Sequence, residues 1–100
     1  MEPDRFSGLI KVFEDAAFAI SQPDNDFSWS GWTDEAAAMA EVNEILAKLR
    51  TGKVPDRLQM EVLFAPTGPL QELSLSSGWA DDFLKLAARF DRELERSRKN

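Results

Sequence analysis

Apolar residues recur at helical spacing through the first fifth of the chain. They follow the i, i+3, i+4, i+7 pattern of an amphipathic helix, at Phe6, Leu9, Ile10, Phe13, Ala16, Ala17 and Ile20. We expect a helix from about Pro3 to Ser21, which Pro23 ends. Val12 and Phe18 lie outside this stripe, which indicates that two neighbours cover the helix. A dimer interface on the widened apolar face is the alternative.

A second helix is predicted from Thr33 to Arg50. Thr33 is a good N-cap, acidic residues follow it in the first turn, and Gly52 marks the C-terminal stop. The apolar stripe of this segment consists of Met39, Val42, Leu46 and Leu49, with Ile45 beside it.

Residues 55–65 carry two competing patterns. Apolar and polar residues alternate from Leu58 to Phe64, which is typical of a strand, whereas Pro55-Asp56 is typical of a helix start. The sequence offers only the short segment 72–75 as a partner strand, and a two-stranded ribbon is weak on its own. A third helix is therefore the favoured interpretation, followed by a turn at residues 66–69.

The last helix is expected to begin near Ser76 or Ser77, with Ser76-Ser77-Gly78 as its N-cap region, and to run towards Arg98. Together the segments predict an all-α fold, a three- to four-helix bundle, in a single domain over residues 1–100. An α+β fold with a small ribbon from residues 58–64 and 72–75 is the alternative. We expect the core at Phe6, Leu9, Ile10, Phe13, Ile20, Met39, Val42, Leu46, Leu49, Phe83, Ala87, Phe90 and Leu94.

The composition narrows the chemistry that the chain can perform. Its 100 residues are 43% hydrophobic and 30% charged, and they include no Cys, no His and no Tyr. Thiolate metal sites, imidazole metal sites and His-based catalytic pairs are excluded by this count. We therefore expect a protein that is not an enzyme, with no cofactor and no metal.

Charge is distributed unevenly. The net charge is −6, and from Val12 onward eight acidic residues precede the first base, Lys48. A negative field repels nucleic acid and anionic lipid and attracts basic proteins, although solubility alone is a sufficient explanation for a small domain. No apolar run reaches the roughly 20 residues of a membrane span, and the first residues are acidic, so we expect a cytoplasmic protein.

The segment from Pro23 to Trp32 combines three aromatic residues with short polar ones. Aromatic side chains are enriched at interface hot spots, but Phe27, Trp29 and Trp32 can equally fold back to cap the core, which is the favoured interpretation. If the segment binds a basic partner, the candidate residues are Asp24, Asp26, Trp29, Trp32, Asp34, Glu35, Glu41 and Glu44.

The same segment has part of a calcium-loop spacing. Asp24, Asp26, Ser28 and Glu35 stand at positions 1, 3, 5 and 12 of such a loop. Position 6, where the loop needs Gly, is Trp29, and shifting the register to gain Gly31 places Ala37 at position 12. Specific calcium binding is therefore not expected.

Residues 63–90 resemble small bacterial proteins without an assigned activity, which implies a bacterial origin and a stand-alone domain but no functional residue. The leading functional hypothesis is an acidic module that binds and masks a basic protein, like an immunity protein or antitoxin. A homodimer with a structural or regulatory role is the second hypothesis, and a carboxylate-based enzyme or metal-binding protein is the third.

Overall fold

A computed structural model describes residues 6–66 and 68–98, and five α-helices and one 3-10 turn make up the regular structure of this part of the chain. In chain order these elements are α1 (Ser7–Ile20), η1 (Phe27–Trp29), α2 (Glu35–Arg50), α3 (Arg57–Phe64), α4 (Pro69–Ser77) and α5 (Ala80–Arg98). The predicted all-α fold is confirmed, because none of these residues forms a strand.

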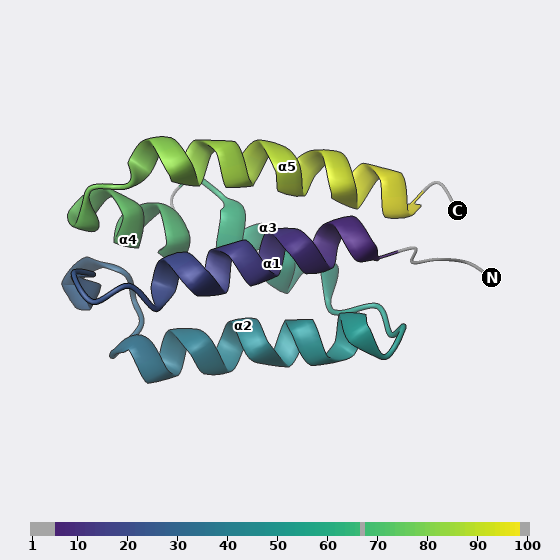
Figure 1. Ribbon diagram of the computed structural model, residues 1–100, viewed down its shortest axis with the longest axis horizontal. Coiled ribbons are helices and arrows are strands. Elements are labelled where there is room, and N and C mark those ends of the chain that lie inside the picture. Colours follow the sequence, from purple (N-terminus) through teal and green to yellow (C-terminus); the bar gives the residue numbers. More distant parts are fainter. Residues whose placement is uncertain (1–5, 67, 99–100) are drawn as a thin grey trace.

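Three long helices run side by side along the 42 Å length of the bundle, with α1 between α2 and α5 (Figure 1). The short helices α3 and α4 lie behind this layer in the view of Figure 1. Two neighbours therefore flank α1, as its widened apolar face predicts. None of the helices in the described residues has the length and apolar character to span a bilayer.

Helix α3 resolves the ambiguity of residues 55–65 in favour of a helix, and the ribbon alternative is wrong. The Asp56 carboxylate caps the helix by accepting a 3.0 Å hydrogen bond from the Leu58 amide. Met60, Leu63 and Phe64 are buried at i, i+3 and i+4. The apparent strand alternation arises because Leu58 and Val62 are apolar but exposed.

The predicted start of the last helix at Ser76 or Ser77 is wrong. These serines form the final turn of α4, whose first residue is Pro69. Gly78 has a φ of +88° and ends α4 in the left-handed conformation that glycine adopts without steric cost. The amides of Gly78 and Trp79 both donate to the Ser74 carbonyl at 2.9 Å, and α5 begins directly afterwards at Ala80.

The ends of α1 and α2 differ from the prediction by small shifts. Asp34, not Thr33, is the N-cap of α2, because its carboxylate accepts a 3.0 Å hydrogen bond from the Ala37 amide. Gly52 ends α2 as predicted, with a φ of +81°. Helix α1 begins at Ser7, and the predicted start at Pro3 lies outside the described residues.

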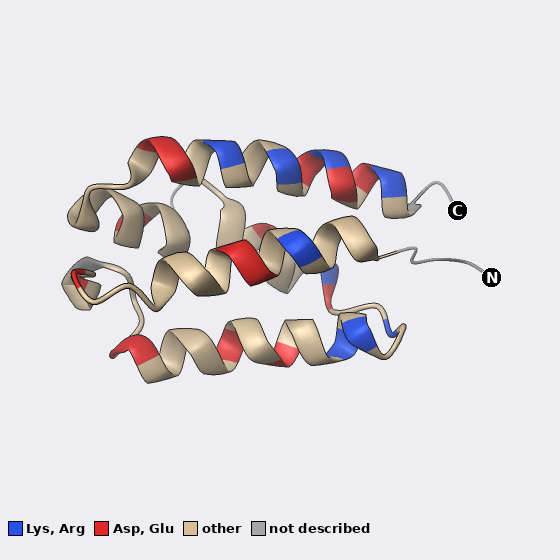
Figure 2. Cartoon of the chain, in the orientation of Figure 1, with Lys and Arg blue, Asp and Glu red and all other residues tan. Residues whose placement is uncertain are grey.

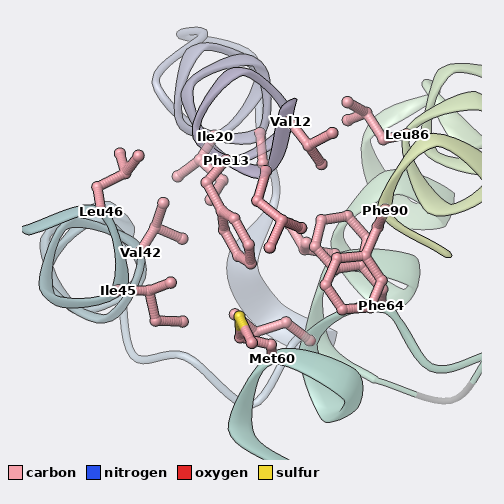
Figure 3. Packing of buried hydrophobic residues seen from close by; sticks show 14 of the residues in the cluster. Val12, Phe13, Ile20, Val42, Ile45, Leu46, Met60, Phe64, Leu86 and Phe90 are labelled. Atoms are coloured by element: carbon pink, nitrogen blue, oxygen red, sulfur yellow. The ribbon is translucent and has the colours of Figure 1, made fainter. Parts of the chain in front are cut away.

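The core contains the predicted side chains and several that periodicity did not identify. Three predicted members, Ile10, Met39 and Ala87, are half-buried and pack against the core, and the other predicted members are buried. Val12 is fully buried, and Figure 3 shows it close to Leu86 of α5. The two short helices add the buried residues Met60, Leu63, Phe64, Leu70 and Leu73.

Four phenylalanines join three helices at the centre of this core. The ring of Phe64 from α3 stacks on Phe90 of α5 with a centroid distance of 4.5 Å and meets the edge of Phe13 from α1 at 5.5 Å (Figure 3). Phe83 stacks at 6.5 Å from Phe64. Aromatic pairs in these geometries stabilise a core beyond the area that they bury.

Phe64→Ala is expected to lower the free energy of unfolding by about 3–5 kcal/mol, because it removes a buried ring and leaves a cavity among three aromatic neighbours. Urea unfolding followed by circular dichroism measures the change. Val62→Ala, on the exposed side of the same helix, serves as the control and is expected to cost less than about 1 kcal/mol. Equal losses from the two variants would contradict the central role of Phe64.

Candidate functional site

Two connections meet at one end of the bundle. The segment between α1 and α2 and the turn between α4 and α5 lie together at the left of Figure 1. Exposed carboxylates gather there, and Figure 2 shows them as red segments. We call this surface the acidic end and define it by Asp24, Asp26, Asp34, Glu35 and Asp81.

Long stretches of sequence without Lys or Arg form the acidic end, and the nearest base along the chain is Lys85, one helical turn after Asp81. Neither residues 16–47 nor residues 58–84 contain Lys or Arg. The last turn of α2 carries Lys48 and Arg50, and Lys53 follows it, so the end of α2 away from its acidic start is blue in Figure 2. The long axis of the bundle therefore separates an acidic end from a region that carries bases.

Asn25 fixes the backbone of this end. Its amide nitrogen lies 2.8 Å from the carbonyls of Ala19 and Ile20 and 3.2 Å from that of Gln22. These contacts satisfy carbonyls in the last turn of α1, which have no partner within the helix. The Asn25 side-chain oxygen accepts a 2.8 Å hydrogen bond from the indole of Trp79. One side chain thus connects α1 to the start of α5.

Asp26 continues this connection through its backbone. Its amide donates to the Ser77 hydroxyl at 2.8 Å, and its carbonyl accepts from the Ser76 hydroxyl at 2.8 Å. Ser76 and Ser77 end α4, so the segment after α1 is clamped to the α4–α5 turn. The sequence interpretation of these two serines as an N-cap missed this role.

The Asp26 carboxylate caps the 3-10 turn η1. The hydroxyl and the backbone amide of Ser28 donate hydrogen bonds that stabilise the charged carboxylate and lower the pKa of Asp26 from its ordinary value of 3.8. Asp34 has the corresponding position at α2. Two carboxylates of the acidic end are therefore also structural caps.

Trp32 belongs to the core and not to the surface. It is buried, and its indole donates a 2.9 Å hydrogen bond to the Glu41 carboxylate. Phe27 is partly buried against the core as well. The prediction that these aromatics cap the core is confirmed for Trp32 and Phe27, whereas the side chain of Trp29 lies outside the described residues.

The structure brings together only part of the predicted partner-binding set. Asp24, Asp26, Asp34 and Glu35 share the acidic end. Trp32 and Glu41 are joined to each other, so Trp32 is not available as an exposed anchor. Glu44 is exposed on α2, but it stands nine residues beyond Glu35, which is about 13 Å along a helix axis.

Asp81 belongs to the acidic end but is not among the partner-binding residues that the sequence predicts. It lies 47 positions beyond Asp34, and only the arrangement of the helices places the two at the same end. The acidic first turn of the last predicted helix was the available signal. Combining it with an antiparallel bundle in which alternate connections share an end would have located Asp81.

The acidic end offers little chemistry beyond charge. No group of three or more acidic residues within residues 6–66 and 68–98 is arranged to hold a metal ion. The partial calcium-loop spacing is used instead for capping, since Asp26 binds Ser28 and Asp34 binds the start of α2.

The chain matches no protein-family model, and no curated protein or solved structure matches it.

Asn25→Asp is expected to lower the free energy of unfolding by about 1–3 kcal/mol, because it replaces the amide donor and places negative charge against the carbonyl end of α1. Urea unfolding followed by Trp fluorescence measures it. Gln22→Glu is the matched control, since Gln22 donates a single exposed 3.0 Å hydrogen bond to Phe18 on the same turn. An equally large loss of unfolding free energy in Gln22→Glu would contradict the structural role of the Asn25 hydrogen bonds.

The cap formed by Asp26 is expected to weaken in acid. Because folding lowers the pKa of Asp26, the stabilisation from its ionised carboxylate is complete above the ordinary value of 3.8 and is lost as pH falls through the lowered pKa. The melting temperatures of wild type and Asp26→Asn should therefore differ at pH 7 and converge in strong acid. Asp24→Asn controls for the loss of one exposed charge. A difference in melting temperature between wild type and Asp26→Asn that grows as the pH falls would contradict the cap.

Proposed function

We propose that the chain is a non-catalytic protein-binding module whose acidic end takes a basic protein partner, in the manner of an immunity protein or antitoxin that masks a basic nuclease. The observation that carries this proposal is the clustering of five exposed carboxylates, from three separate parts of the chain, within stretches 16–47 and 58–84, which contain no Lys or Arg. Masking a basic surface needs complementary charge on a compact scaffold and no catalytic group.

The separation of charge along the bundle supports selective docking at this end. A basic protein is attracted to the carboxylates of Asp24 and Asp81 and repelled by Lys48 and Lys53 at the other end of α2, where Arg50 pairs with Glu14 at 2.9 Å. Such a field orients the encounter and raises the association rate at low ionic strength. Charge changes at the acidic end are therefore expected to alter mainly the association rate and its dependence on salt.

The clamp at Asn25 and Asp26 supports the proposal in a second way. Hydrogen bonds to α1, α4 and Trp79 hold the backbone of the segment that carries Asp24 and Asp26. Charges on a fixed backbone lose little conformational entropy when a partner binds. A preorganised acidic surface therefore binds more tightly than the same residues on a free loop.

The capping roles decide which residues can test the proposal. Charge reversal at Asp26 or Asp34 would also break a helix cap, so that lost binding and lost stability would be confounded. Asp24 and Asp81 are exposed and cap no helix by a hydrogen bond within the described residues. They are the informative positions.

Asp24→Lys combined with Asp81→Lys is expected to weaken capture of the partner. The tagged chain is used to retrieve proteins from the lysate of its own host, with elution in steps of salt, and the purified partner is then used to measure association rates. We expect the wild-type chain to capture a basic protein and to release it at moderate salt. The purified partner should associate with the variant about tenfold more slowly than with wild type at low ionic strength.

Glu44→Lys combined with Asp91→Lys is the matched control. It makes the same change in net charge at exposed positions away from the acidic end. This control is expected to retain the partner and to change the association rate by less than about twofold. Salt-independent capture, or equal effects of the two double variants, would contradict docking at the acidic end.

A further inference from the structure

A groove runs between α1 and α5 on the face of the bundle, next to the acidic end but distinct from it. Its volume is about 360 Å³. Its walls come from the outer sides of the two helices, with Trp79 at the start of α5, and consist of Asp15, Phe18, Ala19, Gln22, Trp79, Asp82, Lys85, Leu86 and Arg89.

Two polar bridges hold these walls together. The Arg89 guanidinium pairs with the Asp15 carboxylate across the groove at 2.9 Å. The Trp79 indole donates to Asn25, which also holds the end of α1, at 2.8 Å. Side chains with apolar surface, Phe18 and Leu86, face the groove between the bridges. The two bridges therefore connect the walls of the groove on either side of its apolar part.

Phe18 is the most exposed large hydrophobic side chain in the described residues, with 68% of its surface accessible. It projects from the side of α1 opposite to Phe13 and Ile20, which are fully buried. Most apolar positions of α1 pack against α2 or α5, but neither neighbour covers Phe18. A large exposed ring beside a preformed apolar groove is typical of an interface.

The charges around the groove are balanced, in contrast to the acidic end. Asp15 and Asp82 carry two negative charges, and Lys85 and Arg89 carry two positive ones. Asp15 and Arg89 pair with each other, whereas Asp82 and Lys85 form no ion pair within residues 6–66 and 68–98. Lys85 and Arg89 disfavour the basic partner here, so this surface needs a different occupant.

A second copy of the chain meets these requirements. The net charge of −6 makes two copies repel each other, and the balanced groove is a surface where they can approach at low electrostatic cost. In a two-fold symmetric contact, one unpaired acid and one unpaired base on the same helix face become two ion pairs. Asp82 and Lys85 stand three residues apart on α5, as such an arrangement requires.

We propose that two copies associate through this groove about a two-fold axis. Phe18 of each copy enters the groove of the other, and Lys85 of each copy pairs with Asp82 of the partner subunit. The five carboxylates that define the acidic end take no part in this contact. The dimer thus presents two acidic ends, and its formation does not depend on the proposed basic partner.

Sedimentation equilibrium of the full chain tests the proposal. The wild-type mass is expected to rise with concentration towards twice 11.3 kDa, with a dissociation constant on the order of 10–100 µM, as for a small interface. Phe18→Glu is expected to remain monomeric at about 500 µM, because it places a charge in the apolar groove. Leu58→Glu, at a side chain that is 66% exposed on α3, is the matched control and should still dimerise.

A charge exchange tests the symmetric pairing. Asp82→Lys and Lys85→Asp should each raise the dissociation constant about tenfold, because like charges then meet at both symmetric contacts. The double variant Asp82→Lys with Lys85→Asp exchanges the two signs and should restore wild-type association. An equimolar mixture of the Asp82→Lys and Lys85→Asp chains should also associate, because each acid then meets a base across the two-fold axis, whereas mixing restores nothing if the residues act only within one subunit.

Three results would overturn the proposal. The first is a wild-type chain that stays monomeric at about 500 µM, which would leave the groove to another occupant such as an apolar segment of a partner protein. The second is a Phe18→Glu variant that still dimerises. The third is a double charge exchange that does not restore association when the single changes weaken it. Circular dichroism of each variant confirms that the fold is retained in every comparison.

Discussion

The packing of Phe64 is the contact on which the arrangement of the helices depends. Helix α3 has only eight residues, too few to be stable by itself in water. Its Phe64 ring lies against Phe13 of α1 and against Phe83 and Phe90 of α5. This contact anchors the chain between the long helices α2 and α5. It thereby lets α4 return to the end where the acidic segment after α1 lies.

Periodicity identified the long helices because one face of each meets a continuous core. It did not identify the boundary between α4 and α5, because Ser-Ser-Gly suits both the start of one helix and the end of another. The left-handed conformation of Gly78 decides between them, because it ends α4 and α5 begins two residues later. Val12 and Phe18 pose the same difficulty: both are off the main stripe, but α5 covers only Val12. Hydrophobic periodicity indicates which side of a helix is buried, but it does not indicate how many flanking positions its neighbours cover.

The candidate site was predictable as a region of charge but not as a surface. The sequence places Asp24, Asp26, Asp34 and Glu35 close together along the chain, whereas Asp81 reaches them only through the helix topology. The sequence also does not show which carboxylates accept hydrogen bonds that stabilise the fold and which do not. Asp26 and Asp34 cap helices, and Glu41 accepts the Trp32 indole, because local backbone geometry brings the donors to them.

The charges of this small chain are distributed unevenly, so two of its surfaces differ in character: one is acidic, and the other is apolar with balanced charges. In the proposed complex with a basic partner, the negative field of the acidic end, which extends about 8–10 Å at physiological ionic strength, guides the partner before contact. The groove between α1 and α5 is lined by two acids and two bases, so in the proposed dimer the attraction arises only at contact, through the burial of Phe18. The same Asn25 holds the segment beside Asp24 and the Trp79 wall of the groove. One side chain therefore holds residues of both surfaces, and the difference in charge between the surfaces is the reason for proposing different partners for them.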